Sequence, residues 1–263
     1  MIKLLAVGDV FGDPGRKMVT THLPRLRDEL GAGLVIVNVE NMHNGRGADA
    51  AGVRAILDAG ADCLTSGNHI WSHKEHERLL ERETRLLRPA NYPEPCPGQG
   101  VTVVSSHEGA RVGVINLIGR LFMAPVDDPF RIADEVIAAL AGKADLIALD
   151  FHAEATSEKQ ALASYLDGRV AAIWGTHTHV QTADARVLPQ GTGYITDLGM
   201  TGPYDSVIGM DRQPAIARFL TSRGSRSIPA AQEAGLRGAL FDLDESTGRC
   251  LAVTRIALGG GGS

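Results

Sequence analysis

The sequence predicts an α/β protein with mixed sheets, and three observations support this prediction. Short apolar runs rich in β-branched residues alternate with longer amphipathic stretches, which is typical of α/β folds. The segments 101–118 and 237–257 each read as two strands around a polar turn, and such hairpins add antiparallel pairs to a sheet. The chain has 263 residues, of which 44% are hydrophobic, enough for a substantial core. We therefore expect two sheets packed face to face, with helices outside.

The apolar and amphipathic runs define the expected elements in order. Buried strands are expected at 3–9, 34–40, 62–66, 145–151 and 170–176, and helices at 14–30, 48–59, 130–142 and 158–167. Asp13 followed by Pro14 predicts a helix start, and Ser157 with Gln160 fits a capping box. Residues 1–258 are expected to form a single domain, followed by a flexible glycine-rich tail at 259–263.

Composition argues against several classes of protein. A net charge of −5 gives no reason to expect a protein that coats nucleic acid. Cys63, Cys96 and Cys250 are widely spaced, so reduced, mostly buried thiols are expected rather than a disulfide framework. The N-terminus reaches Gly8 and Asp9 too soon for a signal peptide, and no apolar run approaches the roughly 18 residues of a membrane span. These features predict a soluble, cytoplasmic protein without a membrane contact.

Polar side chains gather where the expected strands end. Carboxylates, carboxamides and imidazoles follow five apolar runs, at Asp9, Glu40, Asn41, Asn68, His69, His152, His177 and His179. Ligands of open α/β sheets bind at the carboxyl ends of the strands. Some members have ordinary alternatives, because Asp9 could cap a helix, Asn41 could shape a turn and His152 could be a hydrogen-bonded histidine. Their gathering at one edge favours a binding site.

The gathered groups are suited to metal ions. They offer oxygen and nitrogen ligands without a thiolate, a set that fits manganese, iron, zinc, nickel or cobalt. Seven candidates, all of those above except His69, are too many for one tetrahedral zinc and suit two metals that share a carboxylate. Side chains two apart on an extended chain share one face, so the H-x-H pair of His177 and His179 is expected to serve two neighbouring metals.

Five separated motifs carry a family resemblance. The blocks "GDVFGDPGR", "NVEN", "SGNHIW", "DFHAE" and "GTHTHVQ" occur in this order and resemble the calcineurin-like metallophosphoesterase superfamily. With "TDLGMTGPYDSVIG" at 196–209, the chain resembles the YmdB-like branch, which comprises 2′,3′-cyclic nucleotide phosphodiesterases. The resemblance covers about residues 1 to 257. It implies a four-layer α/β/β/α metallophosphoesterase sandwich with a binuclear metal centre at the strand ends.

Two departures from the superfamily pattern bear on the ligands. The usual D-x-H is absent, because Asp9 is followed by Val10 and Phe11, and Glu40 stands where a bridging Asp is usual. The resemblance then implies that Asn41 supplies the ligand of the missing histidine. Metal 1 would take Asp9, Glu40, Asn41 and His179, and metal 2 would take Glu40, Asn68, His152 and His177. Iron or manganese is the first expectation, with zinc as the alternative.

The resemblance implies a phosphodiesterase that hydrolyses 2′,3′-cyclic nucleotides or similar small phosphodiesters. A hydroxide shared by the two metals would attack phosphorus in line, and His69 is the candidate to protonate the leaving alkoxide. Two alternatives stay open: a phosphomonoesterase of broad range, and a regulatory protein that holds RNA or a partner, with incidental hydrolysis. A homo-oligomer is plausible. Arg16, Arg46 and Tyr204 are open between a substrate contact and a solvated surface.

Overall fold

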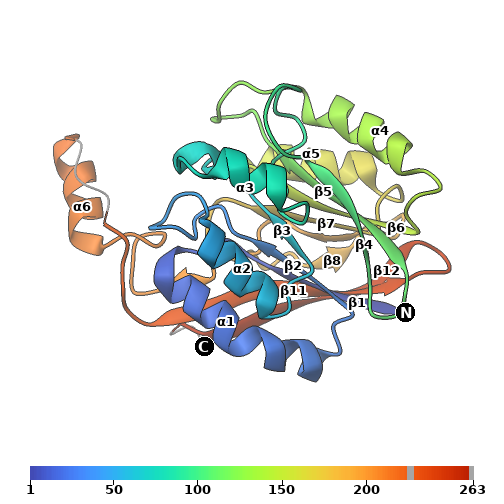
Figure 1. Cartoon of the computed structure of the whole chain (residues 1–263), viewed down its shortest axis with the longest axis horizontal. Coiled ribbons are helices and arrows are strands. Elements are labelled where there is room, and N and C mark those ends of the chain that lie inside the picture. The colour runs from blue at the N-terminus through green and yellow to red at the C-terminus, as the bar shows by residue number, and fades with distance from the viewer. Residues whose placement is uncertain (224–227, 261–263) are drawn as a thin grey trace.

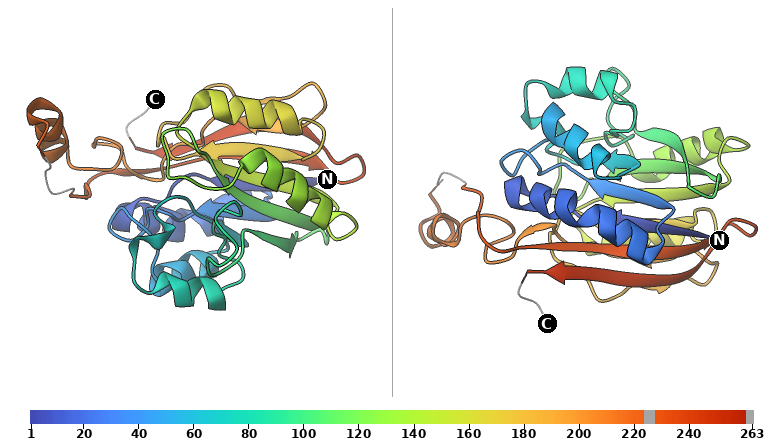
Figure 2. Two further views of the ribbon diagram at one scale, coloured as in Figure 1. Left: turned by 90° about the horizontal axis from the view of Figure 1, so that it is seen from above. Right: turned by 60° about the horizontal axis from the view of Figure 1, so that its bottom comes forward.

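Two six-stranded sheets lie face to face, with helices on their outer sides (Figures 1 and 2). The computed structural model describes residues 1–223 and 228–260. Both sheets are mixed, because each contains parallel and antiparallel pairs. The expected α/β fold, a four-layer sandwich with mixed sheets, is confirmed.

The first sheet has the strand order β10-β11-β1-β2-β3, with β12 paired to β11. Its strands are β1 (Ile2–Val7), β2 (Leu34–Asn38), β3 (Cys63–Thr65), β10 (Gly202–Pro203), β11 (Ala234–Asp244) and β12 (Arg249–Gly259). β1, β2 and β3 run parallel, and β11 and β12 form the hairpin expected near the end of the chain. The three parallel strands therefore point their carboxyl ends toward one edge of this sheet.

The second sheet has the order β4-β5-β6-β7-β9-β8. Its strands are β4 (Val101–Ser105), β5 (Arg111–Ile118), β6 (Leu146–His152), β7 (Ala172–Thr176), β8 (Arg186–Val187) and β9 (Gly193–Ile195). β4 and β5 form the other expected hairpin, whereas β5, β6, β7 and β9 run parallel. β6 and β7 deliver the histidine-bearing segments.

Helices cover both outer faces. α1 (Gly12–Leu30), α2 (Ala50–Asp58), the short 3₁₀ helix η1 (Ile70–Ser72) and α3 (His76–Arg82) lie on the side of the first sheet, and α4 (Pro129–Leu140) and α5 (Thr156–Leu166) on that of the second. α6 (Arg212–Thr221) projects from the body (Figure 1). Within the described residues, no helix is long and apolar enough to cross a membrane.

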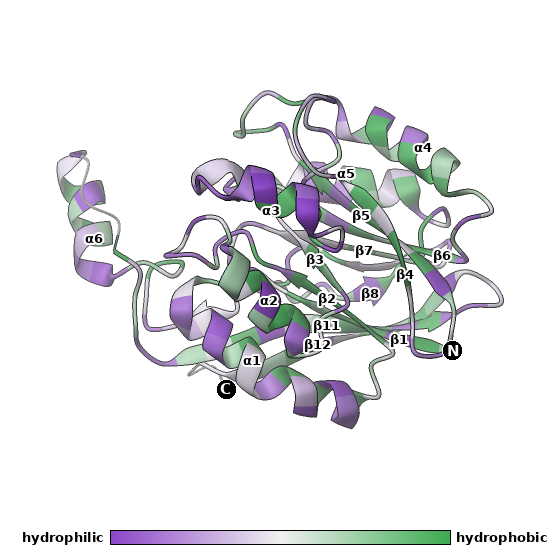
Figure 3. Cartoon of the chain, in the orientation of Figure 1, coloured by the Kyte–Doolittle hydropathy of each residue, from purple (hydrophilic) through white to green (hydrophobic). Residues whose placement is uncertain are grey.

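Three clusters of buried apolar residues fill the interfaces between the four layers. Successive residues of β1 point to opposite faces: Leu5 and Val7 pack under α1 and α2, whereas Leu4 and Ala6 pack between the sheets against residues such as Trp174. A third cluster joins the second sheet to α4 and α5. Strands buried on both faces read as continuous apolar runs, and Figure 3 shows them as mainly hydrophobic beside mixed helices.

Some expected boundaries were wrong. α1 begins at Gly12, and Asp13 does not cap it. α5 begins at Thr156, and its N-cap residue is Ala155, whose methyl side chain accepts no hydrogen bond. The capping box expected from Ser157 and Gln160 was therefore wrong, because Ser157 lies inside the helix. β12 includes Gly259, so the fold reaches into the expected tail, whose residues 261–263 lie outside the described residues.

Candidate metal centre

The segments that follow β1, β2, β3, β6 and β7 meet at one place, and all seven expected ligand residues lie there. The regular strands are shorter than expected, because β1 ends at Val7 and β2 at Asn38. Asp9 and Glu40 therefore lie on the loops beyond the strands, whereas His152 is the last residue of β6. Both loop carboxylates and His152 are buried.

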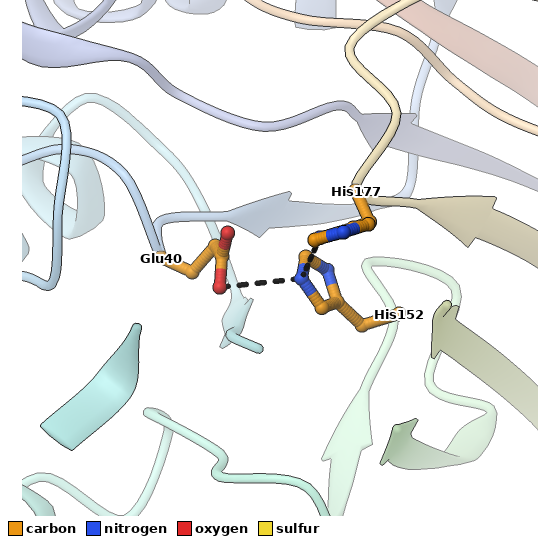
Figure 4. Close-up of side chains that lie close together, drawn as sticks. All are labelled: Glu40, His152 and His177. Atoms are coloured by element: carbon orange, nitrogen blue, oxygen red, sulfur yellow. Dashed lines mark hydrogen bonds and ion pairs between the residues drawn. The ribbon is translucent and has the colours of Figure 1, made fainter. Parts of the chain in front are cut away.

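The first group of donors surrounds the Nε2 atom of His152. This atom lies 3.3 Å from Glu40 Oε2, 3.0 Å from His177 Nδ1 and 3.0 Å from Asn68 Oδ1. Figure 4 shows Glu40 and His177 directed toward His152 from different loops. Glu40, His152 and His177 have the spacing of a group that could hold a metal ion.

The second group shares Glu40 with the first. Ligand atoms of Asp9, Glu40 and His179 lie within 4.8 Å of one another. His179 Nε2 lies 3.2 Å from Asn41 Oδ1, and the Asn41 amide is oriented by the hydrogen bond that its Nδ2 donates to the Gly45 carbonyl. Two donor groups with a common carboxylate are therefore present.

The hydrogen bonds of His152 define which of its nitrogens carries the proton in the neutral ring. Thr176 Oγ1 donates to Asp150 Oδ1 at 2.8 Å and lies 2.9 Å from His152 Nδ1. Because the Thr176 hydroxyl donates its proton to the Asp150 carboxylate, it accepts a hydrogen bond from the Nδ1–H group of His152. The Nε2 lone pair of His152 is then directed at Glu40, His177 and Asn68, which is the orientation that a metal ligand requires.

In His177 and His179, too, a hydrogen-bond acceptor at one ring nitrogen determines which nitrogen carries the proton. Glu154 Oε2 lies 3.0 Å from His177 Nε2, and the Ile208 carbonyl lies 2.8 Å from His179 Nδ1. Each partner accepts a hydrogen bond, so the opposite ring nitrogen is left with a lone pair directed into the centre. Lone pairs that face one another across about 3 Å repel unless a metal ion or a proton lies between them.

A buried oxygen without a partner gives a second test of the fit. Within the described residues, Asp9 Oδ1 is buried and has no hydrogen-bond partner, although such groups are rare in folded proteins. Burial raises the pKa of Asp9 to about 6, against the attraction of His179 and His152. A metal ion would satisfy this oxygen and favour the ionised carboxylate. The residues present therefore fit a metal centre.

The remaining pKa values show how strongly the donors interact. Burial opposes ionisation of Glu40, yet His152 and His69 hold its pKa well below the usual range. Burial alone would lower the pKa of His152, but Glu40 raises it to about 8. Burial and the neighbouring His152 lower the pKa of His177 to about 3. Two acids and three imidazoles thus share one water-poor site.

Comparison with known proteins identifies the family. Residues 5–256 match the family model described as YmdB-like protein. The chain belongs to the YmdB-like family. It is 47% identical over 257 residues to a Bacillus subtilis protein named 2′,3′-cyclic-nucleotide 2′-phosphodiesterase, a match that covers 98% of this chain and 97% of that protein.

Solved structures agree with this family and with its fold. A Mycoplasma pneumoniae protein described as a novel phosphatase superposes with a TM-score of 0.92 at 35% identity, covering 98% of this chain and 93% of that one. The calcineurin-like phosphoesterase YfkN of Bacillus subtilis superposes with a TM-score of 0.58 at 13% identity, covering 99% and 91%. The second likeness shows the fold alone, and that fold is the sandwich described above.

The backbone around the two histidines of this YmdB-like chain differs from the sequence expectation. β7 ends at Thr176, and His177 and His179 have φ angles of 100° and 65°, which are uncommon for residues other than glycine. The shared-face argument for H-x-H was therefore wrong in its geometry. The left-handed turns nevertheless direct the two rings to different donor groups. Such strained conformations cluster at functional sites.

Sequence reasoning missed the buried polar residues that support the donors. Asp150 of β6 accepts hydrogen bonds from Thr176 of its own sheet and from Asn38 and Thr65 of the other sheet. It therefore joins the two sheets beneath the centre. The signal was present, because Asp150 interrupts the otherwise apolar run "LIALDF".

Gly67 shows how closely the loop after β3 approaches the donors. A Cβ atom placed there would lie 2.3 Å from His152 Nε2 and 2.5 Å from Glu40 Oε2. Any side chain at this position would occupy space between these two ligand atoms. The glycine of "SGNH" is therefore required by the centre itself.

His69 lies beside the centre with a free ring. Its backbone N–H donates to Glu40 Oε2 at 3.0 Å, whereas no described residue forms a hydrogen bond with its ring nitrogens. Burial lowers the pKa of His69, and the charge of Glu40 opposes this shift. The ring is available to a substrate, which the metal-directed rings are not.

The three residues left open by the sequence differ in the structure. Arg16 forms an ion pair with Asp13 at 2.8 Å, and Tyr204 donates its hydroxyl to the Met200 carbonyl at 2.7 Å. Arg46 is exposed, and its guanidinium has no partner among the described residues. Of the three residues, Arg46 is therefore the one whose charged group is free to bind a substrate.

Proposed function

We propose that this chain is a metal-dependent phosphodiesterase that hydrolyses 2′,3′-cyclic nucleotides or similar small phosphodiesters. The observation that carries the proposal is the pair of donor groups that share Glu40, with histidine lone pairs directed inward. Two-metal centres of this kind suit phosphoryl transfer. The substrate class is supported by the name of the Bacillus subtilis relative, whose length the match covers almost completely.

We further propose the ligand sets that the sequence implied. Asp9, Glu40, Asn41 and His179 would hold one ion, and Glu40, Asn68, His152 and His177 the other. Iron or manganese suits these oxygen and imidazole donors, and zinc is the alternative. When bound, the ions would supply a water nucleophile at neutral pH and would offset negative charge on the phosphoryl oxygens.

The chain itself would supply the proton for the leaving group. His69 has a free ring beside Glu40, and burial keeps its pKa below the ordinary value in the free enzyme. A phosphodiester bound nearby adds negative charge, which raises the pKa of a neighbouring histidine. His69 would then carry the proton when substrate is present and donate it to the departing alkoxide.

The position of its loop supports a substrate contact for Arg46. The loop that carries it closes on the centre, because the Gly47 N–H donates to the carbonyl of Glu40. A Cβ at Gly47 would lie 3.2 Å from the His69 carbonyl oxygen, so the residue next to Arg46 packs against the His69 segment. A free guanidinium here would bind the phosphoryl oxygens by charge-assisted hydrogen bonds.

Hydrolysis assays with defined metal content test the proposal. Protein loaded with iron, manganese or zinc would be assayed on 2′,3′-cyclic AMP, bis-p-nitrophenyl phosphate and p-nitrophenyl phosphate, with elemental analysis of each sample. We expect turnover of the two diesters and its loss after chelation. Preference for the monoester would instead support a phosphomonoesterase, which the description of the Mycoplasma pneumoniae structure favours. Turnover of no ester with both metals bound would support the binding-protein alternative.

We also infer a cytoplasmic location. All three cysteines are free and two are buried, which suits a reducing compartment. The RNA-related role and the homo-oligomer stay predictions of the sequence. Gel-shift titration with single-stranded RNA tests the first, and light scattering of the metal-loaded protein tests the second.

A further inference from the structure

A cavity of about 360 Å³ opens directly beside the candidate metal centre. His179 forms one wall, and Val180, Met200, Tyr204, Ile208 and Arg237 form others. The volume lies in the range of sites that hold small molecules. His179 also belongs to the donor group with Asp9 and Glu40, so the cavity and the centre share this residue.

The exposed surface at this cavity is apolar. Val180 and Ile208 are 62% and 57% exposed, although β-branched residues are usually buried. Ile208 has a φ of 47°, a genuine outlier for a β-branched residue. Its carbonyl accepts the hydrogen bond of His179. One strained turn thus orients a candidate metal ligand and holds an apolar side chain at the cavity.

The polar side chains that line the cavity are already engaged. Gln181 Nε2 donates to the carbonyls of Gly238 and Ile256 at 2.8 and 3.2 Å. The hydroxyl of Tyr204 donates to a backbone carbonyl, and that of Ser206 both donates to one and accepts from a backbone N–H. These groups have no spare donor for the edge of a ligand.

Arg237 contributes a buried positive charge. It is 6% exposed, and its Nη1 donates to the carbonyls of Leu236, Leu258 and Gly259. Its guanidinium lies over the Tyr204 ring at 4.2 Å. Within the described residues no carboxylate pairs with it. A buried cation without a counter-ion disfavours cationic ligands and favours an electron-rich or anionic one.

We propose that this cavity holds the nucleobase of the substrate while the phosphodiester group lies at the metal centre. The inference rests on the proposed function and concerns how the chain recognises the base, in addition to the phosphodiester group. The lining offers mainly apolar contact to the base, while Gln181 Oε1 and the Nε and Nη2 groups of Arg237 form no hydrogen bond with a described residue. Purines, which have more surface for this contact, are expected to bind better than pyrimidines.

A pair of substrates isolates the base. 2′,3′-Cyclic AMP and glycerol 1,2-cyclic phosphate share a five-membered cyclic diester, but only the first carries a base. Val180→Ser is expected to lower kcat/KM for cyclic AMP about tenfold, through KM, and to leave the glycerol ester unchanged. Leu251→Ser, at another exposed apolar residue (58%), serves as the matched control and changes neither. Equal losses on both substrates, or no loss on cyclic AMP, overturn the proposal.

Binding of adenosine separates this inference from the proposed function. Saturation-transfer NMR on the metal-loaded protein detects adenosine without any hydrolysis. We expect a signal with wild type and Leu251→Ser, and a weakened one with Val180→Ser. If the wild type hydrolyses no ester, the proposed function is refuted. The adenosine signal then still shows whether the cavity binds a nucleobase. No signal with wild type, or equal signals in all variants, refutes the nucleobase site.

Discussion

Lys159 of α5 donates a hydrogen bond to Asp197 with 2.7 Å between Nζ and Oδ2, and both side chains are at most 1% exposed. The same Asp197 oxygen accepts the backbone N–H and the hydroxyl of Thr178, at 3.1 and 2.8 Å. Thr178 lies between His177 and His179. The ion pair therefore connects α5, which covers the second sheet, to the strained loop that carries two candidate ligands.

Replacement of Lys159 tests the value of this connection. Lys159→Met leaves Asp197 buried without its cation, and breaking a buried pair in this way costs about 3–5 kcal/mol. We expect a loss of that size in the free energy of unfolding, measured with urea on metal-free protein. The control Arg25→Met removes the exposed pair with Glu29 and is expected to cost about 0–1 kcal/mol. Similar losses in both variants would show that the buried pair has no special role.

Glu154 is expected to strengthen metal binding without touching the metal. Its carboxylate accepts from His177 Nε2 and leaves Nδ1 for coordination. Hydrogen-bond partners of metal-binding histidines typically raise metal affinity about 10–100-fold. Glu154→Ala is therefore expected to lower the affinity for one of the two ions by that factor. Titration with competing chelators measures it, and Glu154→Gln, which keeps an acceptor, should recover part of the loss. Unchanged affinity in Glu154→Ala would contradict the assigned tautomer.

His69→Ala is expected to keep both metal ions and to lose about 10²–10⁴-fold in turnover of cyclic AMP. The loss should be smaller on bis-p-nitrophenyl phosphate, because p-nitrophenolate leaves without a proton. Elemental analysis and the two rates provide the readouts. If the variant has lost a metal ion, His69 is a ligand and the acid must be sought elsewhere.

Arg46→Ala is expected to raise KM for phosphodiesters about tenfold or more, since a hydrogen bond to a charged group is worth about 1.5–3 kcal/mol. Its guanidinium has no partner among the described residues, so its loss disturbs no internal contact. Arg16→Ala, at an arginine already paired with Asp13, is the control and should leave KM unchanged. Equal KM values for Arg46→Ala and wild type would place Arg46 on the solvated surface.

The main elements of this fold can be predicted because their strands are buried on both faces. Such strands contain few polar residues, so runs such as 34–40 and 145–151 stand out in the sequence. Their ends are harder to place, because a loop can continue in extended form without pairing. Glu40 was expected within a strand, but β2 ends at Asn38. The pattern reports burial, whereas a strand end depends on hydrogen-bond partners from elsewhere.

The sequence by itself determined which residues carry the chemistry. Asp9, Glu40 and the histidines follow apolar runs, and chain direction alone brings the ends of parallel strands to one edge. The tertiary structure decided how those residues are oriented. The proton positions on His152 and His177 depend on Thr176 and Glu154, and that on His179 depends on the carbonyl of Ile208. Such contacts join distant segments, and no local pattern of residues encodes them.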